Sequence, residues 1–151
     1  MNTTTEQLYK FNELSKESQE NAINNYYQFN VEGDWYDFIL QDAYHNTCLI
    51  IEDFGDIDRE GYVVAKFIWD AETTANAILK SPLFGDELPI YKSAKDLLSK
   101  QISESEFLQS LEEYYKRQLI EEYMELTTRE CIIESLISGN YDFNEYGGLI
   151  F

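Results

Sequence analysis

The chain has 151 residues, of which 29 are Asp or Glu and 11 are Lys or Arg, and its formal net charge is −18. With 44% hydrophobic and 15% aromatic residues it can bury a core, which excludes a disordered acidic tail. The charge excludes binding to nucleic acid phosphates or to an anionic membrane surface, and no apolar run reaches the roughly 20 residues of a membrane span.

Two helices are predicted in the first third of the chain. We expect residues 1–10 to be loosely ordered and Ser15 to cap a first helix with an apolar stripe over residues 22–27. Asp34 is predicted to cap a second helix that ends near His45. Both helices are amphipathic, so each is expected to cover one side of a core.

A strand region follows. Residues 47–51 are β-branched and apolar and fit either a strand or an extension of the second helix, and residues 52–61 form an acidic turn region. Residues 62–69 alternate and are the best strand of the chain. Because both of its sides are largely apolar, we expect this strand to be covered on both faces.

Helices dominate the second half. Asp70 is predicted to cap a helix over residues 71–80, and Ser93 is predicted to cap a short one. A capping box at Ser103–Glu106 starts the longest helix, which keeps a 3.6-residue apolar period to Leu126.

The chain is expected to close with one more helix and a hairpin. A second capping box, Thr127 with Glu130, starts the helix, and Gly139 sits where a left-handed C-cap belongs. Residues 141–151 are predicted to form a small hairpin. The predicted fold is therefore a single α+β domain over residues 1–151, mostly helical with a small antiparallel sheet.

The acidic turn partly matches a calcium-binding loop. Asp56, Asp58 and Glu60 followed by Gly61 fit its first half, but the position of the bidentate Glu is Phe67. A solvated acidic turn is the better interpretation. A small metal-dependent enzyme that uses these acids is the alternative, and we expect no metal site and no cofactor.

Other constellations that carry chemistry are weak. His45 and Cys48 lack the third ligand or the orienting partner that a zinc or nucleophile site needs, so we expect a helix-end His and a core Cys. Cys48 and Cys131 fit a reducing compartment as free thiols, with a disulfide as the alternative. No catalytic motif is present, and we expect a cytosolic protein that is not an enzyme.

The acidic residues lie in both terminal thirds. Residues 1–58 hold 12 acids and 2 bases, residues 59–100 hold 6 of each, and residues 101–151 hold 11 acids and 3 bases. If the outer thirds meet in the fold, they form one negative face, and otherwise they form two patches.

The candidate partner-binding residues are acids of residues 32–58 and of the longest helix, with Trp35 and Tyr36 as aromatic anchors, because aromatic side chains are favoured at protein interfaces. Core packing of the aromatic residues is the alternative. The candidates are Glu32, Asp34, Trp35, Tyr36, Asp37, Asp42, Glu52, Asp53, Asp56, Asp58, Glu112, Glu113, Glu121, Glu122 and Glu125.

Three segments resemble a family of small, largely uncharacterised phage and prophage proteins, some of which carry an antitoxin-like label. They are Phe11-Asn12-Glu13-Leu14-Ser15-Lys16-Glu17-Ser18 continuing to Ile23, Asp34-Trp35-Tyr36-Asp37-Phe38, and the stretch from Glu122 through Tyr141-Asp142-Phe143-Asn144 to Gly147. Together they span about half of the chain. The middle departs from the family, because residues 61–71 lack its Gly- and Ser-rich turn.

The resemblance implies phage origin, and small acidic phage proteins often resemble DNA mimics that inhibit host defence nucleases, such as anti-CRISPR and anti-restriction proteins. The leading hypothesis is therefore an acidic inhibitor in the cytoplasm of a bacterial host that binds the basic nucleic-acid channel of such a nuclease. The alternative is an antitoxin-like or regulatory protein that neutralises another basic protein. Simple solubility of the acidic surface is the remaining interpretation.

Overall fold

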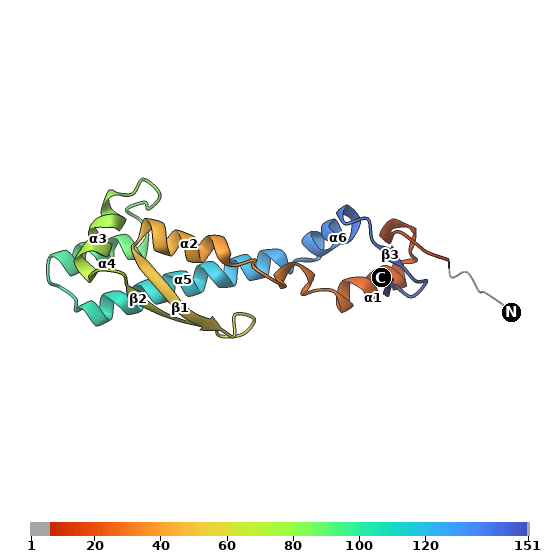
Figure 1. Cartoon of the computed structure of the whole chain (residues 1–151), viewed down its shortest axis with the longest axis horizontal. Helices are drawn as coiled ribbons and strands as arrows, with labels where there is room; N and C mark the ends of the chain where they lie inside the picture. The colour runs from red at the N-terminus through yellow and green to blue at the C-terminus, as the bar shows by residue number, and fades with distance from the viewer. Residues whose placement is uncertain (1–6, 151) are drawn as a thin grey trace. The chain divides into compact units, whose positions relative to one another are not determined.

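The computed structural model describes residues 7–150, so residues 1–6 and 151 lie outside it. It is mostly helical with small antiparallel sheets, which confirms the predicted α+β class (Figure 1). The domain comprises two compact units, a central unit over Asp34–Tyr123 and a terminal unit built from residues 7–33 and 124–150. No helix in the described range is long and apolar enough to cross a membrane.

The central unit contains one hairpin and most of the helices. Its elements are α2 (Asp37–Asn46), β1 (Leu49–Gly55), β2 (Tyr62–Phe67), α3 (Ala71–Lys80), α4 (Pro89–Leu98) and, up to residue 123, α5 (Glu104–Leu126). The strands pair antiparallel from Leu49↔Phe67 to Gly55↔Tyr62, with a register shift between Ile51 and Asp53. Figure 1 shows α3 and α4 at the end where α5 begins, and the hairpin turn toward the other end of the unit.

The core of the central unit is organised around α5. Its residues Phe107, Leu111, Tyr115 and Leu119 recur every fourth position, and all are fully or almost fully buried. Side chains at positions four apart lie on one helical face. Buried residues of every other element of the unit pack in the same cluster.

The hairpin buries only one face. Residues 47–51 form a strand from Leu49 onward, so the strand alternative is the correct one. In β2, Val63 and Ala65 are buried while Tyr62 and Val64 are exposed, and Trp69 beyond the strand is 75% exposed. The prediction of coverage on both faces is wrong, because the helices cover one side of the hairpin and alternate side chains point away from it.

Some of the predicted helix starts are correct. The carboxylate of Asp70 accepts a 2.6 Å bond from the N–H of Thr73 and caps α3. The Ser103–Glu106 box forms in both directions, at 3.1 Å and 3.2 Å. Each of these caps satisfies a backbone N–H that has no partner within its own helix.

Two other starts are wrong. The cap position of α2 is Tyr36, and Asp34 instead accepts a turn bond from the N–H of Asp37 through its carbonyl. Helix α4 begins at Pro89, not after Ser93. Proline suits the first helical position, because the N–H that it lacks would have no helical partner there.

The terminal unit joins the two chain ends. It contains α1 (Lys16–Asn25), α6 (Arg129–Ser138), β3 (Asp142–Phe143), β4 (Leu149–Ile150) and two 3₁₀ turns, Phe11–Glu13 and Phe29–Val31. Tyr9 and Phe143 exchange backbone bonds of 2.9 Å and 2.8 Å. The prediction that residues 1–10 are loosely ordered is therefore wrong for Tyr9. Residues 1–6 of that segment lie outside the described residues. The predicted C-terminal hairpin is confirmed.

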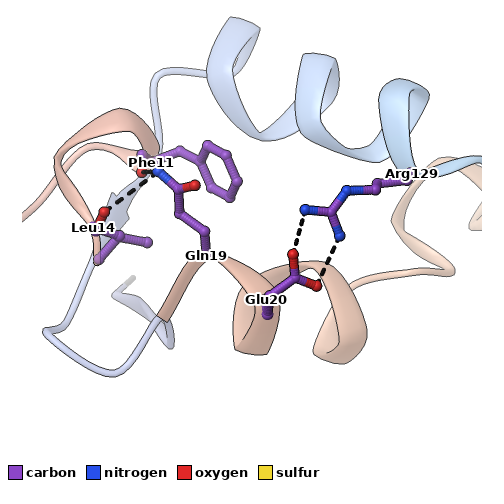
Figure 2. A network of polar contacts seen from close by, with 5 residues as sticks. All are labelled: Phe11, Leu14, Gln19, Glu20 and Arg129. Atoms are coloured by element: carbon purple, nitrogen blue, oxygen red, sulfur yellow. Dashed lines mark hydrogen bonds and ion pairs between the residues drawn. The ribbon is translucent and has the colours of Figure 1, made fainter. Parts of the chain in front are cut away.

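Polar contacts hold α1 to its neighbours (Figure 2). The guanidinium of Arg129 donates to both carboxylate oxygens of Glu20 and connects α6 to α1. This hydrogen bond lowers the pKa of Glu20 below its usual value. The amide of Gln19 donates to the carbonyls of Phe11 and Leu14 and ties the first 3₁₀ turn to α1.

Ser15 caps α1 as predicted, but the terminal unit differs from prediction in three other places. Thr128, not Thr127, accepts the capping bond from the N–H of Cys131. Gly139 has φ −74°, and the left-handed residue is Asn140 at φ 53°. Tyr27 was predicted to lie on the buried stripe of α1 but is exposed. The helix ends at Asn25, so the helical repeat does not place the side chain of Tyr27 on that stripe.

Candidate functional site

Most of the predicted partner-binding residues belong to the central unit. Thirteen of the fifteen lie within Asp34–Tyr123, while Glu32 and Glu125 belong to the terminal unit. The central unit contains acids from both acidic thirds of the sequence. Within it, three groups of these acids have different surroundings.

The first group lies at the turn of the hairpin. Glu52, Asp53, Asp56 and Asp58 are all exposed, and Ile57 is buried between the last two. Burial of Ile57 fixes the turn to the core, so the acids on either side of it face solvent.

The hydroxyl of Tyr62 contacts this group. It donates to Oδ2 of Asp53 at 3.3 Å. The charge of Asp53 is the largest cause that raises the pKa of Tyr62, followed by burial, the hydrogen bond and the charge of Asp56. The two carboxylates thus disfavour the charged form of the tyrosine.

A cluster of aromatic rings brings the second group to the same end. Trp35 contacts Tyr36 and Tyr123 at centroid distances of 5.6 Å and 5.8 Å, and Tyr36 contacts Phe54 of β1 at 4.8 Å. The rings thus join the start of α2 to β1 and α5. The acids next to them in sequence are Asp34, Asp37, Asp53 and Glu122.

Trp35 and Tyr36 themselves are half-buried and pack against the core. Core packing was the alternative to their role as interface anchors, and their contacts fit that alternative. In the isolated chain their rings pack on the core beside these acids. Whether a partner also contacts them stays a prediction.

The third group, Glu112 and Glu113 of α5, contacts other residues of the chain. Glu112 accepts a 2.9 Å hydrogen bond from the N–H of Ala65, on the edge of β2 that faces away from β1. Glu113 forms a 2.9 Å ion pair with Lys116. Glu112 thus satisfies a backbone donor on an edge strand, which discourages pairing with another chain there. A contact over 47 residues leaves no local sequence signal.

These observations define an acidic end of the central unit. It comprises Asp34, Asp37, Glu52, Asp53, Asp56, Asp58, Glu60, Glu121 and Glu122. Within residues 7–150 none of these acids forms an ion pair. The one base interspersed among them in sequence is Arg59, whereas residues 70–100, which contain α3 and α4, hold five acids and four bases. The charge of the central unit is therefore strongly one-sided.

Asp42, also predicted, has a different environment beside two tyrosines of α5. Its Oδ1 accepts a 2.7 Å bond from Asn46, and its Oδ2 accepts a 3.1 Å bond from the hydroxyl of Tyr115. Burial raises the pKa of Tyr114, and the charges of Asp42 and Glu121 raise it further. Asp42 and Glu121 thus act on the same tyrosine from two helices.

The turn acids do not converge as metal ligands. Across the described residues, no three His, Cys, Asp or Glu side chains are placed to hold a metal ion. This finding covers Asp56, Asp58 and Glu60 as well as His45 with Cys48. Cys48 and Cys131 are not joined in a disulfide, so the thiol prediction is confirmed, although both are half-buried and neither is fully in the core.

Comparison of the chain with protein-family models, with curated proteins and with solved structures finds no match. The resemblance to phage and prophage proteins therefore stays a prediction.

Proposed function

We propose that the chain is a non-enzymatic binding protein that docks its acidic end on the basic, nucleic-acid-binding surface of a protein partner. In this proposal its carboxylates occupy positions that phosphates otherwise take, as in a DNA mimic. The sequence resemblance favours a phage protein that acts in the cytoplasm of a bacterial host on a defence nuclease of the anti-CRISPR or anti-restriction target type.

The observation that carries the proposal is the set of acids at one end of the central unit, all exposed except the half-buried Glu122, that form no ion pair among residues 7–150. Like charges gathered in this way oppose the compact state. A basic partner relieves that repulsion on binding. Complementary charge also accelerates encounter and makes association sensitive to salt.

Mimicry of nucleic acid makes a specific demand on the partner. Duplex DNA carries one charge per ~1.7 Å of its axis, and proteins bind it with Lys and Arg. If the acidic end occupies the DNA-binding surface of the partner, DNA added in excess competes for that surface and releases the protein. Competition by DNA therefore separates mimicry from inhibition at another surface.

The test is capture of partners from a bacterial lysate that contains CRISPR and restriction complexes. The full chain is immobilised, and capture is compared at low and high salt, with and without added duplex DNA. We expect a nuclease complex that is retained at low salt and released by high salt or by DNA. A nuclease that is retained despite DNA would contradict mimicry, and a basic partner without nucleic acid affinity would favour the antitoxin-like or regulatory alternative.

A pair of charge-matched variants locates the surface. The variant Asp53→Asn/Asp56→Asn/Asp58→Asn neutralises the hairpin turn and should weaken capture by at least about tenfold at low salt. Each exposed charge contact with the partner contributes about 0.5 kcal/mol of binding free energy, so the loss of three such contacts gives about this effect. The control, Glu72→Gln/Asp86→Asn/Glu87→Gln, changes the net charge equally at exposed positions outside the acidic end. Equal loss in both variants would mean that only total charge matters and would overturn the assignment of the surface.

A further inference from the structure

A hollow of about 260 Å³ opens on the central unit between α2, the loop after α3 and the middle of α5. Phe38 and Leu83 lie at it with 59% and 62% of their surfaces exposed, although both are large apolar residues. Phe84 and Tyr114 line it as well, with their rings 6.2 Å apart in an edge-on arrangement. Exposed apolar residues around a concave site are typical of a surface that a partner covers.

The same hollow contains a negative charge. Asp42 lines it, and both partners of its carboxylate, Asn46 and Tyr115, are neutral donors. Among residues 7–150 no cation forms an ion pair with this half-buried carboxylate. A carboxylate has about four acceptor positions, so each oxygen of Asp42 retains capacity for another donor.

Apolar and aromatic walls next to a carboxylate favour one kind of partner side chain. An arginine places a planar cation over aromatic rings, offers a fork of N–H donors to a carboxylate and covers apolar surface with its stem. Leucine or methionine would fill the apolar part but leave the carboxylate without compensation. A phosphate or carboxylate ligand would be repelled by Asp42 and Glu121.

We infer that this hollow receives an arginine side chain of the basic partner, with the guanidinium between Asp42 and the rings of Phe38 and Tyr114. The inference rests on the proposed function and adds a point of specificity to it. Diffuse charge at the acidic end gives rapid encounter, whereas a pocket for one side chain fixes the register of the complex.

The probe is a blocked Gly-Arg-Gly tripeptide, titrated at low salt into the full ¹⁵N-labelled chain. The matched control peptide carries citrulline, which keeps the length of arginine and three of its five N–H donors, has a carbonyl oxygen in place of one terminal nitrogen, and lacks the charge. We expect the arginine peptide to shift the amide resonances of Phe38, Asp42, Leu83 and Tyr114. The citrulline peptide should bind at least about tenfold more weakly, as loss of a partly desolvated cation–π contact and its ion pair implies.

Variants confirm the position. Phe38→Ala and Asp42→Asn should each weaken binding of the arginine peptide roughly three- to tenfold. Phe38 is exposed, so its replacement leaves the core intact. The controls are Tyr44→Ala, an exposed aromatic residue of the same helix, and Asp37→Asn, an exposed acid of the same helix, and each should change affinity less than about twofold.

Three results would overturn the inference. Equal binding of the citrulline peptide would show that the hollow takes an uncharged chain. Shifts confined to Asp53–Asp58 would place the cation at the hairpin and would leave the proposed function standing. The absence of any shift would remove the arginine site, and the capture of DNA-displaceable partners would then judge the proposed function separately.

Discussion

At the scale of single residues, Tyr115 makes buried polar contacts that connect two segments of the central unit. Its side chain is 1% exposed, and its hydroxyl donates to Asp42 and lies 3.2 Å from the hydroxyl of Thr47. Thr47 also donates to the carbonyl of Ala43 at 2.8 Å. The network connects α5 to the C-terminal half of α2 and holds the carboxylate that lines the hollow.

Removal of that hydroxyl should destabilise the protein. In Tyr115→Phe, Asp42 loses a donor in a half-buried site, which costs about 1 to 2 kcal/mol of unfolding free energy. Urea unfolding measures this cost, with Tyr91→Phe as the control, because no described hydrogen bond involves the hydroxyl of Tyr91. A loss in Tyr115→Phe no larger than in the control would show that the hydroxyl contributes nothing net.

The same residue predicts how stability responds to alkaline pH. Burial raises the pKa of Tyr115 far above its ordinary value near 10, and the lowering by the hydrogen bond with Thr47 does not offset this. The unfolded chain therefore releases a proton above about pH 10 that the folded chain retains, so this contribution is complete below pH 10 and lost as pH rises.

Unfolding free energies measured from pH 8 to 11 should thus fall above about pH 10, by up to about 1.4 kcal/mol per pH unit for one such group. Tyr115→Phe should show a shallower fall than the parent chain. Parallel curves for the two proteins would contradict the assigned shift.

At the scale of elements, local chemistry predicted which helices form better than where they begin. The Asp70 cap and the Ser103–Glu106 box were predictable because each cap contacts an N–H three residues away. Adjacent threonines at 127 and 128 are equally suitable caps in sequence, and the fold decides between them. The strand was misjudged because its apolar outer face, with Val64 exposed, does not follow the rule that apolar residues are buried.

The candidate site shows the same limit more strongly. Sequence identified Asp42 and Glu112 as acids, but their contacts with Tyr115 and Ala65 span 73 and 47 residues. Neighbouring residues in the sequence give no sign of such long-range pairings. The sequence alone therefore could not distinguish Glu112, which bonds to the chain, from the exposed acids of α5. The hollow was not predictable either, because Leu83 belongs to a loop far in sequence from Phe38.

The choice between the two threonines is testable. Thr128→Ala should destabilise the protein by about 1 kcal/mol, because the N–H of Cys131 loses its capping oxygen. Thr127→Ala is the matched control, since the hydroxyl of Thr127 donates to the carbonyl of Met124 at an exposed position and its loss should cost less. Thermal unfolding of both variants gives the comparison, and a larger loss in Thr127→Ala would favour the capping box predicted from sequence.

At the scale of the whole molecule, both units are acidic. Asp34–Tyr123 holds 19 acids and 8 bases, and the remainder of the chain holds 10 acids and 3 bases. The ion pairs among residues 7–150, such as Glu20 with Arg129, are largely exposed, and exposed pairs contribute little. We therefore expect repulsion between acids to be the dominant electrostatic effect on stability, and in the proposed function a basic partner relieves it.

Salt should consequently stabilise the free protein. Because the screening length falls from about 30 Å at 0.01 M to about 8 Å at 0.15 M, the unfolding free energy should rise by on the order of 1 kcal/mol over that range. Melting temperatures in NaCl and KCl should rise alike, which separates screening from specific ion binding. The Asp53→Asn/Asp56→Asn/Asp58→Asn variant should show a flatter salt dependence than Glu72→Gln/Asp86→Asn/Glu87→Gln, because repulsion is concentrated at the acidic end. A melting temperature that falls with salt would instead mean that attractive pairs outweigh repulsion, and the argument that the acidic end is strained until a partner covers it would fail.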